Sequence, residues 1–315
     1  MTADITSIVI PTYRRPDLLR NLLQSLTRQR TSRTFEVIVV NDGSGGSLSE
    51  LEIEFSDIAL KVVDLAASRG RAFARNEGVR HSRGSGIIFV DDDMTVVEDF
   101  VEAHVAARTS PNTVVIGNIL RAPEFGNDPL ARYVERQGIN KLKSRDSIPP
   151  KCVRTGNVSL GRELFDKIGM FDERITRYGE DMDLGMKLSS GQADFIFAEE
   201  AIAYHHHPPD IDDMMEKMRE YGRFTVPKLV AVHPELARVI RIDLAEPIRL
   251  FRESPVLSAK KIALRMILTG PFYALARSVY RMRWLGSLLF PLIDYMRAYN
   301  YIRGYWQATK EGPTC

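Results

Sequence analysis

The stretch Gly86-Ile-Ile-Phe-Val-Asp-Asp-Asp93 joins a short apolar run to three consecutive acids. An apolar run of this length, rich in β-branched and aromatic residues, predicts a buried strand. Successive side chains of an extended chain point to opposite sides, so Asp91 and Asp93 are expected to face one site and Asp92 another. Two neighbouring carboxylates repel each other unless one is protonated or a cation lies between them. We therefore expect a site for Mg²⁺ or Mn²⁺ here, with a solvated acidic turn as the alternative.

Further apolar runs alternate with helical patterns on both sides of this stretch. We expect strands at residues 7–11, 35–40, 60–63, 114–117 and 195–198, and helices starting at Pro16 and within 69–80, 162–169, 180–190 and 211–232. Strands that alternate with helices predict right-handed crossovers and an α/β fold with a mainly parallel sheet. Such sheets bind ligands beyond the carboxyl ends of their strands, which is where the polar residues of this chain gather.

Two other polar clusters are candidates for chemistry. Glu180, Asp181 and Asp183 follow Gly179 at the start of an expected helix. Acids at a helix start are partly explained by the helix dipole, but three of them also suit a general base at the edge of the sheet. The run His205-His206-His207 follows an expected strand, and one of its imidazoles could bind a metal rather than play a structural role.

Composition and missing motifs narrow the class of protein. The chain has 315 residues, of which 44% are hydrophobic and 27% charged, as in ordinary globular proteins. Its two cysteines exclude a disulfide scaffold and a cysteine-rich zinc site. The sequence has neither a P-loop nor a Gly-x-Gly-x-x-Gly turn after the first strand, and it lacks a Gly-x-Ser-x-Gly elbow. Phosphates are therefore not expected to be bound in those ways.

Taken together and in order, the motifs resemble a family 2 glycosyltransferase over about residues 5–207. The segments that carry the resemblance are Ile8–Tyr13, Val40–Ser44, Ala74–Gly78, Phe89–Asp93, Thr155–Asn157, Gly169–Glu173, Gly179–Leu184 and His205. The resemblance implies a GT-A fold, a Rossmann-like α/β architecture in which a nucleotide-diphosphate sugar lies across the strand ends. The family usually has Asp-Asp where this chain has Asn41-Asp42, so no role is carried over to Asn41.

The same resemblance implies roles for individual residues. The residues expected to bind the nucleotide, usually a uridine nucleotide, are Pro11, Tyr13, Arg14, Asp42, Arg75, Asp91 and Asp92. Those expected near the donor sugar or acceptor are Gly156, Asn157 and Glu180. Asp93 would bind Mn²⁺ or Mg²⁺ with His205 as a further ligand and His207 as the reserve, and Asp181 would be the catalytic base.

The implied reaction is inverting sugar transfer to a hydroxyl of a glycan or lipid-linked acceptor, in polysaccharide or envelope assembly. A dTDP- or GDP-sugar is the alternative donor. A non-catalytic protein that binds nucleotide sugars, or a membrane scaffold, is the alternative of another class. We do not expect a nucleic-acid partner, because an acidic cleft repels phosphate.

The end of the chain differs in charge from the rest. Residues 255–315 contain nine Lys and Arg against two acids, a net charge of +7, which leaves −5 for residues 1–254. We expect a catalytic domain at 1–210 and a basic helical region at 211–315, which binds an anionic membrane surface, caps the catalytic domain or forms an oligomer contact. Because no signal peptide is evident and no apolar stretch is long enough to span a bilayer, we expect a cytoplasmic protein, peripheral at the inner face of the membrane.

Overall fold

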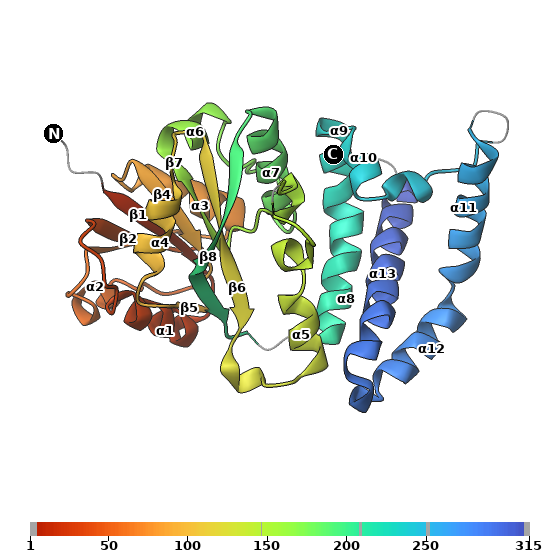
Figure 1. Ribbon diagram of the computed structural model, residues 1–315, viewed down its shortest axis with the longest axis horizontal. Helices are drawn as coiled ribbons and strands as arrows, with labels where there is room; N and C mark the ends of the chain where they lie inside the picture. Colours follow the sequence, from red (N-terminus) through yellow and green to blue (C-terminus); the bar gives the residue numbers. More distant parts are fainter. Residues whose placement is uncertain (1–4, 146, 208–209, 250–252, 312–315) are drawn as a thin grey trace. The chain divides into compact units, whose positions relative to one another are not determined.

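A computed structural model describes residues 5–145, 147–207, 210–249 and 253–311. The chain divides into two compact units. The first comprises Met1–Gly126 and Val134–Pro208, and the second comprises Asn127–Tyr133 and Pro209–Cys315. The first unit is an α/β unit and the second is helical (Figure 1).

The first unit is built on one eight-stranded sheet within the described residues, in the order β3-β2-β1-β4-β7-β6-β8-β5. Its strands are β1 Thr6–Thr12, β2 Phe35–Asn41, β3 Leu60–Asp64, β4 Gly86–Val90, β5 Met94–Val96, β6 Thr113–Arg121, β7 Asn157–Gly161 and β8 Asp194–His205. The four strands β3, β2, β1 and β4 are parallel, as expected. The sheet as a whole is mixed, because β7 runs antiparallel to β4 and β6, and β5 runs antiparallel to β8.

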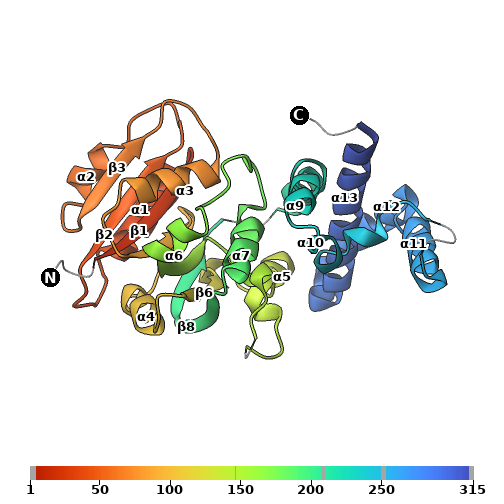
Figure 2. The same cartoon turned by 90° about the horizontal axis from the view of Figure 1, so that it is seen from above.

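Helices cover both faces of this sheet (Figure 1, Figure 2). The helices of the first unit are α1 Pro16–Leu26, α2 Glu50–Glu54, α3 Arg71–Arg80, α4 Phe100–Ala107, α6 Arg162–Lys167 and α7 Glu180–Ser190, with 3₁₀ turns η1 Pro123–Phe125, η2 Gly138–Lys141 and η3 Pro150–Cys152. Because side chains alternate along a strand, Ile8 and Ile10 of β1 pack with α1 on one face while Val9 packs with α3 on the other. The leucine stripe of α1, at positions 19, 22, 23 and 26, is fully buried.

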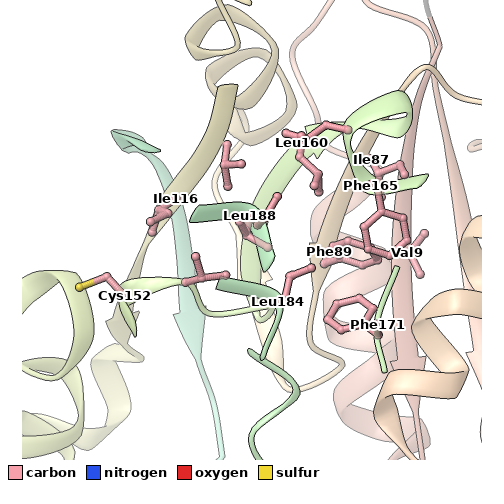
Figure 3. Close-up of a cluster of buried hydrophobic side chains, with 14 of the residues drawn as sticks. Val9, Ile87, Phe89, Ile116, Cys152, Leu160, Phe165, Phe171, Leu184 and Leu188 are labelled. Carbon is pink, nitrogen blue, oxygen red and sulfur yellow. The ribbon is translucent and has the colours of Figure 1, made fainter. Parts of the chain in front are cut away.

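An aromatic cluster on the α3 face joins β4 to the segment that precedes α7. Phe89 of β4 lies 5.4 Å from Phe165 and 5.3 Å from Phe171, measured between ring centroids (Figure 3). Leu184 and Leu188 of α7 belong to the same buried cluster. Burying these five large apolar side chains stabilises the unit by about 1.5–3 kcal/mol each, and it fixes α7 against the sheet beside the end of β4.

Strand β8 is much longer than the expected strand at 195–198. It pairs with β6 on both sides of a register shift at Gly117/Asn118, and the exposed Glu199 and Glu200 lie in the irregular segment. The prediction ended the strand too early because these two acids interrupt the apolar run, whereas a bulge accommodates them in the structure. As a result His205 is the last residue of β8, where it pairs with Met94, the residue after the acidic cluster.

The second unit consists of helices. They are α8 Ile211–Glu220, the π-helical turn η4 Tyr221–Thr225, α9 Val226–Val232, α10 Leu236–Val239, η5 Ile242–Leu244, α11 Pro255–Ile267, α12 Gly270–Tyr280, η6 Arg283–Leu289 and α13 Phe290–Glu311; α5, Pro129–Glu135, contributes residues to both units. Gly222 and Gly304 allow close packing of η4 and α8 on α13, since a Cβ at either position would lie about 2 Å from a carbonyl oxygen of the facing helix.

Most aromatic residues of α13 pack inside the second unit. Tyr305 is buried, and Tyr295, Tyr299, Tyr301 and Trp306 pack against the same cluster. These aromatic side chains therefore contribute to the packing of the second unit. Within the described residues every helix is too short or too polar to cross a lipid bilayer.

Candidate active site

The predicted site residues lie along one edge of the sheet. The parallel strands β1, β2 and β4 end there at Thr12, Asn41 and Val90. The antiparallel strand β7 starts at the same edge, because its first residue, Asn157, pairs with Val90. Residues 11–15, 41–44, 91–93 and 155–157 are thus brought to one place although they lie far apart in the sequence.

A buried arginine connects two of the acidic segments. Arg75 of α3 is 1% exposed, and its Nη2 lies 2.7 Å from Asp91 Oδ1 while its Nη1 lies 3.1 Å from Glu180 Oε1. A buried guanidinium is stable only when its charge is compensated, and here two carboxylates compensate it. Arg75 therefore holds the acid after β4 next to the acidic start of α7. Its predicted contact with a nucleotide stays a prediction.

Asp181 stands at the start of α7, which follows Gly179 at φ 103°, a backbone conformation that favours glycine. The Thr155 hydroxyl donates a hydrogen bond to Asp181 Oδ1. Burial raises the pKa of Asp181 to about 6, and the Glu180 and Asp91 charges add to the rise while Arg75 and Thr155 oppose it. A carboxylate with a pKa near 6 is a stronger base than an ordinary aspartate and is still mostly ionised at neutral pH.

Asp92 and Asp93 do not separate as the alternation of an extended chain predicted, because residues 92–93 form a turn and Arg15 Nη1, which pairs with Asp93, also lies 3.5 Å from Asp92 Oδ1. Asp92 is buried and accepts a 2.7 Å hydrogen bond from Thr12 Oγ1, and burial raises its pKa to about 6. Asp93 Oδ2 lies 2.7 Å from Arg15 Nη1. Burial alone would raise the pKa of Asp93, but His205, Arg15 and His207 lower it to about 2. Asp93 is therefore an anion at every physiological pH.

The three histidines point in different directions, His205 at the end of β8 and the other two just beyond it. His205 Nε2 lies 3.5 Å from Asp93 Oδ2, and the ring of His207 lies 6.3 Å from that of His205. His206 turns the other way and hydrogen-bonds to Thr95 Oγ1 and Glu124 Oε1, both at 2.7 Å. The geometry thus excludes His206 from the Asp93 site and leaves His205 and His207 beside it.

Asp93 and His205 offer the donor atoms that a divalent cation accepts. Asp93 Oδ1 is buried and has no hydrogen-bond partner, so one carboxylate oxygen is available as a ligand. Within the described part of the chain, no three His, Cys, Asp or Glu side chains gather closely enough to enclose a metal ion. An ion at this position would need additional oxygen ligands, as Mg²⁺ commonly obtains from water and substrate phosphates.

The residues predicted to bind the nucleoside lie at the ends of β1 and β2. Pro11 is buried in β1, and Tyr13 beyond it is 42% exposed with the Arg14 guanidinium 4.9 Å from its ring centroid. The Asp42 carboxylate accepts hydrogen bonds from Ser68 Oγ and from the backbone N–H groups of Arg69 and Gly70. Asp42 therefore fixes the loop before α3, and its predicted contact with a base stays a prediction.

Gly156 and Asn157 lie at this edge in two different environments. A Cβ on Gly156 would lie 2.9 Å from Asp91 Oδ2, so the backbone at Gly156 passes close to this carboxylate. Asn157 is fully buried, and its amide bonds to His104 and to the carbonyl oxygens of Asn118 and Ala201. The side chain of Asn157 thus holds β7 to β6 and β8, and its predicted place near the donor sugar or acceptor stays a prediction.

Comparison with known proteins identifies the family. The family model described as "Glycosyl transferase family 2" matches residues 7–169. This chain belongs to the family 2 glycosyltransferases. It is 28% identical over 263 residues to the uncharacterized glycosyltransferase YfnE of Bacillus subtilis, covering 66% of this chain and 67% of that protein. It is 26% identical over 263 residues to a chondroitin synthase of Pasteurella multocida, covering 71% of this chain and 27% of that protein.

Solved structures share the fold of this glycosyltransferase. A mannosyltransferase of Pyrobaculum calidifontis, in complex with GDP-Man and Mn²⁺, superposes with a TM-score of 0.60 at 18% identity and covers 98% of this chain and 88% of that one. Residues 1–349 of S. aureus TarS, in complex with UDP-GlcNAc, superpose with a TM-score of 0.50 at 19% identity, covering 97% and 92%. The GT-A fold is thus confirmed. The chain spans about a quarter to a half of the length of several curated relatives.

The structure adds site residues of this glycosyltransferase that the sequence analysis missed. Arg15 pairs with Asp93, and Thr155 bonds to Asp181. Arg71 lies one helical turn before Arg75, and although desolvation opposes the change, the Asp91 and Glu180 charges raise its pKa. The spacing of four between Arg71 and Arg75 was a signal that both face the same side of α3. Nothing local to Arg15 or Thr155 indicated their partners, which lie 78 and 26 residues away.

Proposed function

We propose that this glycosyltransferase moves a sugar from a nucleoside-diphosphate donor to an acceptor hydroxyl in a single inverting displacement that depends on a divalent cation. The observation that carries the proposal is the contact of Arg75 with both Asp91 and Glu180. This contact supports a common site for the acids of residues 91–93 and those of 180–181. Sugar transfer needs carboxylates that can hold a divalent cation and a further carboxylate that can act as a base, and the proposed site would supply both.

In the proposed mechanism Asp181 takes the proton from the acceptor hydroxyl. The oxygen of that hydroxyl attacks the anomeric carbon, the bond from this carbon to the phosphate oxygen breaks, and the nucleoside diphosphate leaves with the electron pair. The pKa of about 6 supports this role, because Asp181 is then ionised at neutral pH and still basic enough to accept a proton during the attack. Thr155 orients the carboxylate through its hydrogen bond.

The residues that would hold the cation are Asp93 and His205, with His207 as the reserve. The unpartnered Asp93 Oδ1 and the imidazole 3.5 Å from Oδ2 support this assignment. When bound, Mn²⁺ or Mg²⁺ would act as a Lewis acid that stabilises the charge developing on the leaving diphosphate. Asp91, held by Arg75, is assigned to the donor ribose, and Tyr13, Arg14 and Asp42 to the nucleoside.

The proposed donor is a UDP-sugar, with a GDP-sugar as the alternative. Two comparisons support these two nucleotides, since one similar structure contains UDP-GlcNAc and another contains GDP-Man. Relatives that are chondroitin and hyaluronan synthases support a glycan or polysaccharide acceptor. We assign catalysis to residues 1–210 and propose that residues 211–315 form a separate helical region, consistent with the division of the chain near residue 208.

The experiment is a screen of nucleotide sugars for donor hydrolysis and transfer, with Mn²⁺ present, followed by the same assay on Asp181→Asn. We expect turnover of the variant to fall at least ~100-fold, the usual loss when a general base is removed, while donor binding measured by calorimetry is unchanged. The matched control is Asp57→Asn, the same change at an exposed position of the first unit, which should be fully active. Near-normal turnover of Asp181→Asn would remove Asp181 from the role of base.

A further inference from the structure

The helical unit carries exposed apolar side chains on a short part of the chain. We name as the α11–α12 surface six residues of α11, α12 and the following turn η6 that are each more than half exposed: Met266, Ile267, Phe272, Leu275, Trp284 and Leu288. The largest exposures are 82% for Trp284 and 76% for Leu288. Scattered apolar residues are normal on a protein surface, but a concentration of large ones marks an interaction site.

The exposed apolar side chains are not residues that failed to enter the core, because the same segments bury other residues. Leu268 of the α11 segment is 4% exposed, and Ala276 and Tyr280 of α12 are 4% and 8% exposed, so both segments already bury one side. On α12 the outer stripe consists of Phe272, Leu275 and Val279, at helical spacing. α11 and α12 follow one another beside α13 (Figure 1, Figure 2). α12 is thus apolar on two sides, of which its own unit covers one, whereas the buried residue of α11 itself is Lys261.

The charge of the same segment has one sign. From Ser254 to Ile293 the sequence contains six Lys and Arg and no Asp or Glu. Lys261 is buried and pairs with Glu253, and Arg277 pairs with Asp212, so these two charges are compensated inside the unit. Lys260 and Arg281 are exposed. The apolar residues therefore lie on a segment whose own charges are all basic, with Glu253 and Asp212 as paired acids from outside it.

We infer that the α11–α12 surface binds the interface of an anionic lipid bilayer, with its apolar side chains inserted among the lipids and its basic residues at the head groups. Apolar side chains flanked by Lys and Arg are the pattern of helices that lie in a membrane interface, and an exposed tryptophan suits that depth. A second copy of this chain fits less well, because a symmetric contact would bring the same positive charges together. This inference rests on the helical unit alone and does not depend on the proposed reaction.

The experiment measures co-sedimentation of the full chain with vesicles of phosphatidylglycerol and phosphatidylcholine, and with vesicles of phosphatidylcholine only. We expect binding to the mixed vesicles that weakens as salt rises and is much weaker without the anionic lipid. The double variant Phe272→Ser/Trp284→Ser should lower the partition coefficient at least ~10-fold, since interfacial binding scales with the apolar area inserted. The double variant Lys260→Glu/Arg281→Glu should lower it at least ~10-fold and remove most of its salt dependence.

Two controls keep the result interpretable. Ile53→Ser changes an 82% exposed apolar residue on α2 of the other unit and should leave binding unchanged. Thermal unfolding followed by circular dichroism should give the same transition for all variants, because exposed side chains contribute little to stability. Equal vesicle binding by the wild type and Phe272→Ser/Trp284→Ser would overturn the inference. The inference would also be overturned if the wild type did not bind vesicles but formed a dimer, and Phe272→Ser/Trp284→Ser were monomeric. The surface would then bind a second copy.

Discussion

The strand-end site of the α/β unit and the α11–α12 surface of the helical unit are both unusual in which side chains they bury and expose, but in opposite ways. The first buries charges, such as Arg75 with Glu180, where a fold alone would bury apolar side chains. The second exposes apolar side chains, such as Trp284 and Leu288, where a fold alone would expose polar ones. A buried charge is costly unless paired, and an exposed apolar cluster is costly unless covered.

The comparison teaches where to look for function in each unit. In the α/β unit every buried charge of the site has a partner, apart from single atoms such as Asp93 Oδ1, which is where we place a ligand. In the helical unit the buried Lys261 has an acidic partner and Arg277 pairs with Asp212 at the surface, while Lys260 and Arg281 are exposed on the same segment as the apolar residues. Each site is thus identified by groups that lack a partner within the described chain: a carboxylate oxygen without a hydrogen bond in one unit, and uncovered apolar side chains in the other.

The largest effect is expected from a substitution in the strand-end site. Asp93→Ala removes the unpartnered carboxylate oxygen, so the cation loses a proposed protein ligand. In wild type, chelation should weaken donor binding at least ~100-fold, because the cation would link protein carboxylate to donor phosphate, whereas in Asp93→Ala chelation should change nothing. Titration calorimetry with Mn²⁺ and then with EDTA measures this, and Asp17→Ala at an exposed position of α1 is the control. A variant that still binds donor in a metal-dependent way would contradict the assignment.

A pair of leucine substitutions tests the apolar side. Leu268→Ala in the core of the helical unit should lower the free energy of unfolding by about 2–5 kcal/mol, since it leaves a cavity. Leu275→Ala on the α11–α12 surface, 61% exposed, should change it by less than about 0.5 kcal/mol. Urea unfolding of both variants measures the difference. A large decrease in the free energy of unfolding of Leu275→Ala would show that this leucine stabilises the fold, which would argue against a role in binding a partner.

The pH dependence of turnover tests the pairing inside the site. A general base acts only when ionised, so turnover should fall about tenfold per pH unit below the pKa of Asp181, about 6, and be level above it. Thr155→Val removes a hydrogen bond that stabilises the charged form and should shift this limb to higher pH. Thr155→Ser keeps the hydroxyl and should leave it in place. An unchanged profile in Thr155→Val would show that another group sets the acid limb.

Local patterns were sufficient for much of the α/β unit. The apolar runs that became β1, β2, β3 and β4, and the leucine stripe of α1, were predicted because strand and helix periodicities are properties of a few consecutive residues. The acids after β4 could be predicted at a strand end for the same reason. The full length of β8 could not, since the bulge that accommodates Glu199 and Glu200 depends on its pairing with β6.

What the sequence alone determined is therefore the kind of fold, the family and the segments that carry chemistry. Tertiary structure decided which side chains meet: that Arg75 joins Asp91 to Glu180, that Asn157 is turned into the sheet, and that His206 faces away from Asp93. It also decided which aromatic residues of the tail are exposed, leaving Trp284 outside and Tyr305 inside. The reason is physical, because periodicity is set by bonds along the chain, whereas a partner is set by packing between residues that are distant in sequence.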